Sequence, residues 1–163
     1  MLREVEHLSR PTKTEYYLNI AKTVALRSTC LRRKYGAIIV KDDTIVSTGY
    51  NGTARCLPNC IDIGHCPREE QQIAAGARYD LCRAVHAEMN AVINAARSGA
   101  STMGGTMYLA GLDAKTEEPL KDVVKPCILC SRVIINAGIK EVAMPQGSML
   151  PKELSEEYLH EFK

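Results

Sequence analysis

The chain has 163 residues, of which 45% are hydrophobic and 25% are charged, the usual balance of a globular domain. A chain of this length buries a core without disulfide staples, so we expect one domain over residues 1–163. The net charge of +2 and the absence of Trp do not support a nucleic-acid surface or a platform for stacked bases.

The ends and the cysteine content predict a cytoplasmic protein. The N-terminus MLREVEHLSR has no apolar segment typical of a secretory signal, and no apolar run reaches the length of a membrane span. The seven Cys residues are an odd number, so they do not make a complete disulfide set. In a reducing compartment, clustered Cys residues favour metal binding or catalysis.

The first part of the chain predicts a helix and a β-hairpin. Apolar residues recur at helical spacing over residues 14–29, with Thr12 or Thr14 as the cap. Two β-rich runs then flank KDDT, which is typical of a hairpin. The run GAIIV is almost wholly apolar, so we expect helices to cover this strand on both faces.

The middle of the chain predicts a long Cys-rich loop over residues 51–82 that leads into a helix. Gly, Pro, Asn and Cys crowd its first part, and a loop of this length in a compact domain usually has a function or a tether. A short helix is expected over residues 69–79. A stronger helix is expected over residues 84–97, ending before Gly99, which suits the first position after a helix.

The second half alternates strands with helices. The run TMYLAG predicts a strand, residues 112–125 a polar connection, and Pro126 the first residue of a helix that stops at Gly138. A strand KEVAM and a terminal helix over residues 151–162 follow. This alternation predicts parallel strand pairing and a layered α/β fold.

A candidate metal centre combines His86 with Cys127 and Cys130. The run PCILC places both Cys side chains on one face of the first helical turn, where exposed amides favour the thiolate form. A catalytic zinc keeps three protein ligands and an open position for water. Glu88 follows His86 by two residues, so the two side chains border one metal only if their helix points its N-terminus at it.

Each half of this pattern has an ordinary interpretation. A lone His in an apolar helix is usually a core residue, and a lone C-x-x-C motif is also typical of a thioredoxin-like redox pair. That redox motif normally follows the first strand, whereas PCILC comes late in this chain. Together, H-x-E followed by P-C-x-x-C is the known signature of zinc nucleobase deaminases.

At these motifs the chain resembles the cytidine and deoxycytidylate deaminase family, and its dCMP deaminase branch in particular. The resemblance rests on four segments: ALRSTCLRRKYGAIIV, STGYNGTARCLPNC, LCRAVHAEMNAV and KPCILCSRVIINAGIKEV. It implies a three-layer α/β sandwich with a mixed central sheet flanked by helices. It also implies a homo-oligomer, commonly a hexamer, and often an allosteric nucleotide. Residues 112–125 depart from the family as an extra loop before the Pro-Cys motif.

The resemblance also assigns roles to residues. It implies Zn²⁺ held by His86, Cys127 and Cys130, a proton shuttle at Glu88, and Asn51 near the sugar. Zinc would activate water to attack C4 of cytosine, and Glu88 would carry protons to N3 and to the leaving amino group. The predicted reaction is the conversion of dCMP to dUMP and ammonia.

A second group of metal-binding residue types falls in and beside the Cys-rich loop. Three interpretations stay open: a closed structural zinc site, disulfides, or ordinary buried thiols. Cys60, Cys66 and Cys82 are the first choices as ligands, with His65 and Cys56 as further candidates. In contrast, Cys30 is expected to be a small core residue in the first helix.

A nucleotide phosphate needs cations or free hydrogen-bond donors. The candidates are Arg27, Ser28 and Thr29 at the end of the first helix, and Arg55 just past YNG. The interpretation of each as an ordinary solvated residue is slightly favoured, because the C-terminus of a helix repels anions. Against it, Ser and Thr followed by LRRK form a dense local group of hydrogen-bond donors.

Two other functions compete with a free-nucleotide deaminase. One is a deaminase that acts on a base in tRNA or single-stranded DNA, which needs a basic track for the backbone. The other is a non-catalytic scaffold with structural zinc, which would have no use for Glu88.

Overall fold

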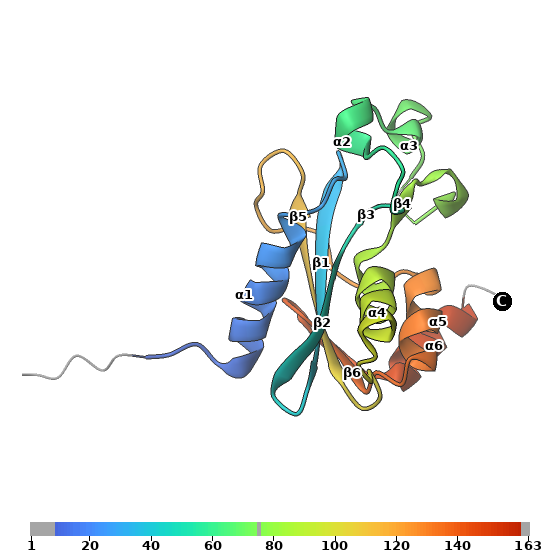
Figure 1. Cartoon of the computed structure of the whole chain (residues 1–163). Helices are drawn as coiled ribbons and strands as arrows, with labels where there is room; N and C mark the ends of the chain where they lie inside the picture. Colours follow the sequence, from blue (N-terminus) through green and yellow to red (C-terminus); the bar gives the residue numbers. More distant parts are fainter. Residues whose placement is uncertain (1–8, 75, 161–163) are drawn as a thin grey trace, which may run out of the picture.

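The computed structural model describes residues 9–74 and 76–160, and a five-stranded sheet forms its centre (Figure 1). The strand order is β2-β1-β5-β6-β7. Only β5 and β6 run parallel among these pairs, so the sheet is mixed. Its strands are β1 (Arg33–Lys41), β2 (Thr44–Tyr50), β5 (Thr106–Asp113), β6 (Glu141–Met144) and β7 (Gly147–Met149).

Helices cover both faces of this sheet. On one face lies α1 (Lys13–Ala25), and on the other lie α4 (Ala87–Ser98) and α5 (Ile128–Asn136), with α6 (Pro151–His160) packed against α5 (Figure 1). Both α1 and α4 pack on β1, whose central residues are all buried. The predicted three-layer α/β sandwich and the double coverage of GAIIV are therefore confirmed. No helix in the described part of the chain is long and apolar enough to cross a membrane.

Two glycines let α1 and α4 approach the hairpin closely. A Cβ atom on Gly36 would lie 2.2 Å from the carbonyl oxygen of Ala21 in α1. A Cβ atom on Gly49 would lie 2.2 Å from the backbone nitrogen of Ala91 in α4. Because these neighbours are backbone atoms, no side-chain rotation relieves the overlap. Glycine at these positions thus sets how near each helix lies to the sheet.

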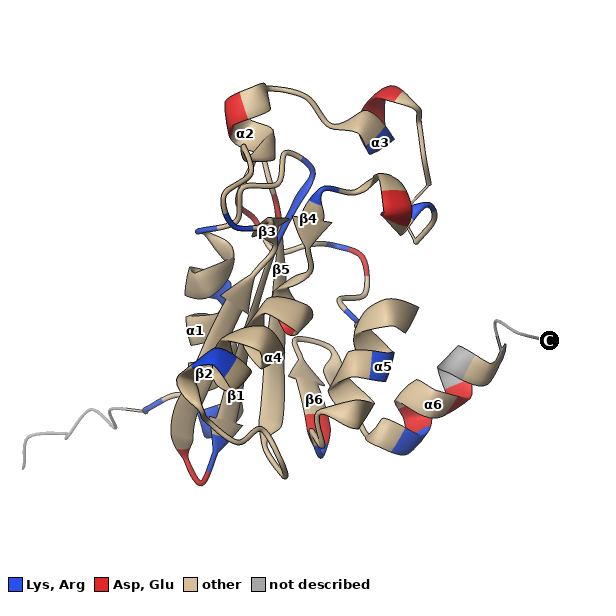
Figure 2. Ribbon diagram, turned by 45° about the vertical axis from the view of Figure 1, so that its right-hand side comes forward, with Lys and Arg blue, Asp and Glu red and all other residues tan. Residues whose placement is uncertain are grey.

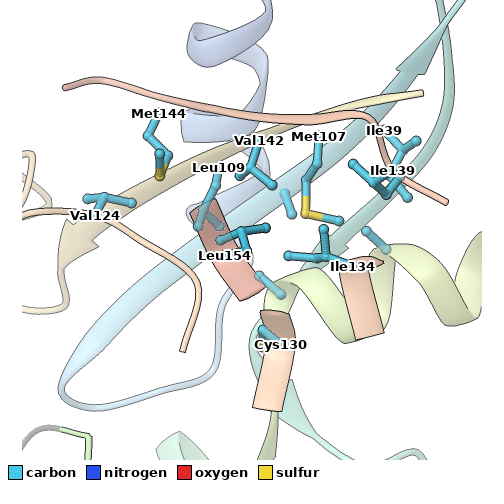
Figure 3. Close-up of a cluster of buried hydrophobic side chains, with 13 residues drawn as sticks. Ile39, Met107, Leu109, Val124, Cys130, Ile134, Ile139, Val142, Met144 and Leu154 are labelled. Carbon is cyan, nitrogen blue, oxygen red and sulfur yellow. The ribbon is translucent and has the colours of Figure 1, made fainter. Parts of the chain in front are cut away.

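The larger hydrophobic cluster lies between the sheet and the α4–α5 layer (Figure 3). Fully burying one aliphatic side chain contributes about 1.5–3 kcal/mol, so this cluster is a main source of stability. Cys130 of α5 belongs to it and is fully buried. One member of the candidate metal centre is therefore positioned by the core. The labelled members are Ile39, Met107, Leu109, Val124, Cys130, Ile134, Ile139, Val142, Met144 and Leu154.

Several predicted boundaries are wrong for identifiable reasons. The first helix starts at the capping box of Thr12 but ends at Ala25 rather than at residue 29. The hydroxyl of Ser28 donates to the carbonyl oxygen of Asn51 at 2.8 Å and accepts from the N–H of Cys30 at 3.2 Å, a local alternative to helical hydrogen bonds.

The predicted Cys-rich loop, residues 51–82 and from here called the Cys-rich segment, folds differently from its prediction. The helix expected over residues 69–79 is absent from its described residues. The segment instead contains the short helices α2 (Cys60–Ile63), α3 (Pro67–Glu70) and the 3₁₀ helix η1 (Tyr79–Leu81), of which the last two overlap only the ends of the predicted range. Strands β3 (Gly52–Thr53) and β4 (Ala84–Val85) pair with each other and bring the two ends of the segment together.

The two helices of the candidate centre start later than predicted. Because β4 takes the two residues before His86, α4 begins at Ala87. It ends at Ser98 with Gly99 at φ 74°, as expected for a left-handed cap. Pro126 precedes the N-cap residue of α5 rather than opening the helix. The predicted terminal helix is present as α6, and its residues 161 and 162 lie outside the described residues.

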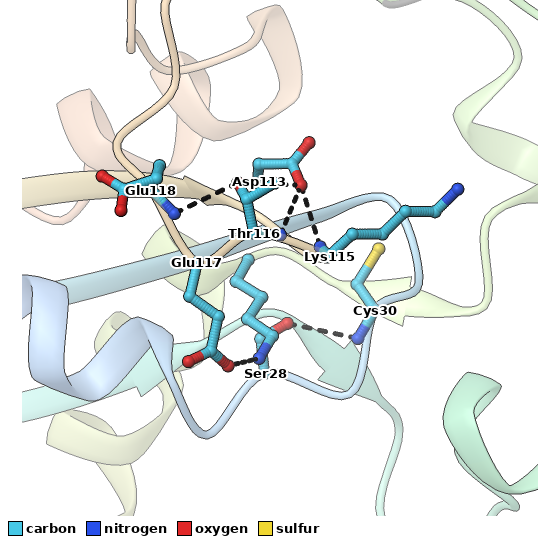
Figure 4. Close-up of polar contacts among 8 residues, drawn as sticks. Ser28, Cys30, Asp113, Lys115, Thr116, Glu117 and Glu118 are labelled. Carbon is cyan, nitrogen blue, oxygen red and sulfur yellow. Dashed lines mark hydrogen bonds and ion pairs between the residues drawn. The ribbon is translucent and has the colours of Figure 1, made fainter.

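The polar connection before the Pro-Cys motif is a turn anchored to the sheet. The strand β5 continues through Asp113, two residues into the predicted loop. Oδ1 of Asp113 accepts the N–H groups of Lys115 and Thr116 at 2.8 and 3.0 Å (Figure 4). The carboxylate of Glu117 binds Nζ of Lys34 at 2.5 Å. The loop is thereby held beside the start of β1.

Candidate metal centre

Two helix N-termini meet at the candidate metal centre. His86 is the N-cap residue of α4, and Cys127 is the N-cap residue of α5. Nδ1 of His86 lies 3.4 Å from Sγ of Cys127 and 3.3 Å from Sγ of Cys130. A tetrahedral zinc with nitrogen at about 2.1 Å and sulfur at about 2.3 Å separates such ligand atoms by about 3.5 Å. These side chains have the spacing that a zinc ion requires.

The close spacing of the ligand atoms distinguishes the His86, Cys127 and Cys130 group from other acidic, His and Cys side chains in the described residues. In residues 9–74 and 76–160, it is the one set of three or more His, Cys, Asp or Glu side chains whose ligand atoms all lie within 4.8 Å of one another. Cys127 and Cys130 follow His86 in the chain by 41 and 44 residues. The end-on approach of both helices, predicted from the spacing of His86 and Glu88, is what brings them together.

Polar contacts fasten the start of α4 to the sheet. Nδ2 of Asn90 donates to the carbonyl oxygen of Tyr50 at 2.8 Å, at the end of β2. The buried hydroxyl of Ser47 donates to the carbonyl oxygen of Ala91 at 2.6 Å. With the close approach at Gly49, these contacts fix the position of the helix N-terminus that carries His86.

The electrostatics of the trio favour one thiolate. The hydrogen bond from the thiol of Cys130, with a smaller contribution from His86, lowers the pKa of Cys127 to about 4. That hydrogen bond and burial raise the pKa of Cys130. The hydrogen bond to Cys127 raises the pKa of the His86 imidazole. The protein alone thus holds one sulfur charged, and a divalent cation is what would hold both.

A buried carboxyl group lies beside the trio. Glu88, in the first turn of α4, is only 5% exposed and lines the same cavity as His86 and Cys127. Burial raises the pKa of this carboxyl group. A carboxyl group with a raised pKa holds a proton more readily than an ordinary carboxyl group does, which suits acid–base chemistry.

The Cys-rich segment supplies one wall of this cavity. The ring of Tyr79 meets the ring of His86 edge-on at 5.0 Å between centroids, and the guanidinium of Arg68 lies 5.0 Å from the Tyr79 ring. Arg68 is 8% exposed, and its Nη2 donates to the carbonyl oxygens of Ala74 and Ala77 at 3.0 and 2.7 Å. Within the described residues, its Nε has no hydrogen-bond partner.

Sequence reasoning missed most of the cationic and aromatic residues of the cavity. The additional lining side chains include Arg32, Arg33, Tyr35, Arg68, Tyr79 and Lys125. For Lys125, the available signal was its place directly before the Pro-Cys motif. For Arg68 and Tyr79 there was none, because they reach the cavity only through the fold of the Cys-rich segment.

Asn51 was predicted near the substrate, and it does line this cavity. Its amide also holds β1. Oδ1 accepts the N–H of Tyr35 at 2.7 Å, and Nδ2 donates to the carbonyl oxygen of Arg33 at 2.9 Å. Each amide atom keeps capacity for one more hydrogen bond, so both contacts leave room for a ligand.

The other predicted substrate residues are not brought to this cavity. Arg27, Ser28 and Thr29 line a separate hollow, which they share with the turn after β5. Arg55 is exposed, and its Nη2 donates to Oδ1 of Asn94 on α4 at 3.2 Å. Arg32, unlike Arg27, lines the cavity together with His86.

All seven cysteines are free thiols in the structure, so the disulfide interpretation of the second group finds no support. Cys60 is buried, Cys66 and Cys82 are half-buried, and Cys56 is exposed. Cys30 is half-buried and lies in neither hydrophobic cluster, contrary to its predicted role in the core.

An α/β sandwich with a His–Cys–Cys group at two helix N-termini, beside a buried carboxyl group, has the features of a metal-dependent hydrolase. The chain belongs to the cytidine and deoxycytidylate deaminase family. The family model described as "cytidine and deoxycytidylate deaminase zinc-binding region" matches residues 11–145. The resemblance predicted from the motifs is thus confirmed.

Individual relatives point to one branch of this family. The chain is 32% identical over 151 residues to the deoxycytidylate deaminase of Saccharomyces cerevisiae, covering 93% of this chain and 43% of that protein. It is 36% identical over 146 residues to the deoxycytidylate deaminase of Mycobacterium phage D29, covering 86% of this chain and 100% of that protein. The chain thus spans about two fifths of the yeast relative but the whole of the phage relative.

The fold likewise matches a solved member of the family. The crystal structure of dCMP deaminase from the cyanophage S-TIM5, in complex with dCMP and dUMP, has a TM-score of 0.61 and 28% sequence identity to this chain. The match covers 84% of this chain and 83% of that chain.

Proposed function

We propose that this protein catalyses the zinc-dependent hydrolytic deamination of a cytosine nucleotide, converting dCMP to dUMP and ammonia. The observation that carries the proposal is the buried carboxyl group of Glu88 in one cavity with His86 and Cys127. The relatives named deoxycytidylate deaminase, at 32% and 36% identity, support the choice of dCMP.

In this proposal, His86, Cys127 and Cys130 hold zinc and leave a coordination position open to solvent. Zinc held there would polarise water for attack on a base. Glu88 would accept a proton from the water that adds to C4, pass a proton to N3 of the cytosine, and protonate the amino group that leaves C4 as ammonia. A carboxyl group whose pKa is raised by burial is suited to both directions of transfer.

The walls of the cavity offer recognition of the rest of the nucleotide. The side chain of Asn51 can hydrogen-bond a sugar hydroxyl, since each amide atom keeps a free position. Cationic side chains around the same cavity, from Arg32, Arg33, Arg68 and Lys125, suit a phosphate group. We therefore propose a nucleotide rather than a free nucleoside as substrate.

Charge distribution supports a small substrate over a nucleic acid. Acidic and basic residues occur side by side on α3 and α6 (Figure 2). The net charge is only +2. A nucleic-acid-directed deaminase needs a continuous basic track for the backbone.

The test is ammonia release from a panel of dCMP, CMP, dCTP, deoxycytidine, cytidine, guanine, adenosine and a folded tRNA, with zinc measured on the same sample. We expect dCMP to have the highest kcat/KM. Turnover confined to the tRNA would favour the nucleic-acid-directed function. No ammonia from any substrate, with zinc bound, would indicate the non-catalytic scaffold.

Assembly, regulation and location are further parts of the proposal. By resemblance to the dCMP branch we propose a homo-oligomer, a hexamer in the first instance, and regulation by an allosteric nucleotide. Light scattering of the purified protein tests the assembly, and the dependence of deamination rate on added nucleotides such as dCTP tests the regulation. The seven free thiols fit a reducing compartment, so we propose that the protein acts in the cytoplasm.

A further inference from the structure

One aromatic side chain of the Cys-rich segment lies beside two of the proposed zinc ligands. The ring of Tyr79 meets the imidazole of His86 edge-on, with 5.0 Å between the centroids and 73° between the planes. The hydroxyl of Tyr79 lies within hydrogen-bonding reach of the sulfur of Cys127. Because His86 and Cys127 are the N-cap residues of α4 and α5, Tyr79 contacts a ligand at each of the two helix tips.

Arg68 holds the Tyr79 ring from within the Cys-rich segment. Its guanidinium lies over this ring, where the aromatic face attracts a cation. Arg68 is buried, and its Nη2 donates to the carbonyl oxygens of Ala74 and Ala77. These carbonyl groups belong to the connection between α3 and η1, so Arg68 ties the chain just before Tyr79 to α3. The position of the ring is therefore fixed by Arg68 as well as by His86.

A second tyrosine of the same cavity has a different partner. Tyr35 of β1 lines the cavity together with His86. Its hydroxyl lies within hydrogen-bonding reach of the guanidinium of Arg33, whose Nη2 also donates to Oδ2 of Asp122 at 2.6 Å. The hydroxyl of Tyr35 thus faces a cation, whereas that of Tyr79 faces a proposed metal ligand. The two residues allow the same chemical change to be made at a ligand and away from one.

A hydroxyl beside a metal-bound thiolate has an electronic effect. Two thiolates balance the charge of a divalent cation and so weaken its pull on the electrons of other ligands. A hydrogen bond donated to one thiolate withdraws part of the electron density that this sulfur gives to the metal. Groups that hydrogen-bond to metal ligands also fix their orientation, and they tune metal sites in this way.

We propose that Tyr79, held by Arg68, is a positioning residue of the metal centre. Its hydroxyl donates to the thiolate of Cys127, and its ring limits rotation of the His86 imidazole. The Cys-rich segment thereby controls how strongly a metal held by the two helix tips polarises water. This inference rests on the zinc centre of the proposed function, and it assigns Tyr79 no contact with the nucleotide.

The test is the absorption spectrum of the full chain reconstituted with cobalt in place of zinc. Subtracting the spectrum of Cys127→Ser/Cys130→Ser leaves the charge-transfer band from the thiolates of this centre alone. In Tyr79→Phe, which keeps the ring, we expect this band to move to longer wavelength, because a thiolate without its hydrogen bond gives up an electron more easily. An unmoved band would overturn the proposal.

Two further variants locate the effect. Tyr35→Phe is the matched control, because it removes a hydroxyl from the same cavity but not from a ligand, and its band should stay in place. Arg68→Gln releases the Tyr79 ring, so its band should move in the same direction as that of Tyr79→Phe. A shift in Tyr35→Phe as large as that in Tyr79→Phe would contradict a specific role for Tyr79, and an unmoved band in Arg68→Gln would overturn the role of Arg68.

Steady-state kinetics of the zinc protein separate positioning from substrate binding. Loss of a group that hydrogen-bonds to a metal ligand costs about 10- to 100-fold in activity, so kcat of Tyr79→Phe for dCMP should fall by that factor. KM should stay close to that of the unaltered protein. A raised KM with unchanged kcat would show that Tyr79 binds the substrate instead, and the proposal would be wrong.

The outcomes also separate this inference from the proposed function. A thiolate band that is present in the unaltered protein and unmoved in Tyr79→Phe would overturn the inference alone. No thiolate band in the difference spectrum of the unaltered protein would overturn the metal centre, and with it both the inference and the proposed function.

Discussion

The two walls of the cavity are built in opposite ways. On one side, His86, Glu88 and Cys127 lie at the tips of α4 and α5, which pack on the sheet over a large hydrophobic cluster. On the other side lie residues 54–83, here called the cysteine segment, which contribute Arg68 and Tyr79 from short helices. No side chain of these short helices belongs to either hydrophobic cluster. The first wall is ordered by apolar burial and the second by polar contacts.

This difference indicates where each wall can tolerate change. Chemistry that needs sub-ångström placement is located on the helices whose positions the core determines. In the proposed function, recognition of the substrate extends over a segment whose order depends on a few contacts, and such segments unfold locally at lower cost. Substitutions on the two sides should therefore have different signatures, which the following experiments measure.

The largest effect is expected for Glu88, on the wall that α4 and α5 form. Glu88→Gln removes the proposed proton carrier and keeps the size of the side chain, so dCMP deamination should fall by about 10³-fold or more. Zinc content and melting temperature should stay close to those of the unaltered protein. Steady-state kinetics and elemental analysis check this, and near-normal kcat would refute the role of Glu88.

A steric clash with the backbone of α4 should displace the helix that carries Glu88. In Gly49→Ala, the new methyl group would lie 2.2 Å from the backbone of α4, and relief by movement of the helix should cost about 3 kcal/mol. Gly36→Ala is the matched control, because it makes the same clash with α1 on the opposite face. Urea denaturation should find both variants destabilised, but only Gly49→Ala should lower kcat of the remaining folded protein. Equal kcat losses would mean that α4 is not specially tied to the site.

The next prediction concerns which arginine binds the phosphate: Arg32, which the structure favours, or Arg27, which the sequence analysis named as a candidate. Arg32 lines the cavity with His86, whereas Arg27 lines a separate hollow. Losing a charge-assisted hydrogen bond costs about 1.5–3 kcal/mol, so Arg32→Gln should raise KM for dCMP by about 10- to 100-fold. Deoxycytidine, which lacks the phosphate, should be used equally well by both proteins. A larger effect from Arg27→Gln would restore the original prediction.

The smallest effect is expected far from both walls. The carboxylate of Asp43 accepts hydrogen bonds from Lys13 and from the hydroxyl of Tyr17, and the first of these mainly lowers its pKa below 3.8. Its stabilising effect is complete above the pKa of the unfolded chain and is lost as pH falls through the folded value. Asp43→Asn should therefore lower the melting temperature by a few degrees at most at pH 7. That difference should shrink below about pH 4, and a difference independent of pH would contradict this account.

Much of the candidate site could be predicted from the chain alone. Because an N-terminal helix tip exposes every side of its first turn, the spacing of His86 and Glu88 already implied end-on helices. The positions of Cys127 and Cys130 were likewise readable, since C-x-x-C at a helix start is a local pattern. The hydrophobic runs that alternate with helices also predicted the layered α/β fold, because each run is a pattern within one strand or helix.

Contacts between distant segments could not be predicted in this way. The presence of Arg32 rather than Arg27 in the cavity and the contact of Tyr79 with His86 depend on how the chain folds around β3 and β4. Periodicity and motif spacing describe neighbours along one helix or strand. Which surfaces of those elements then face each other is decided by burial summed over the whole core, and that sum exists only in the folded chain.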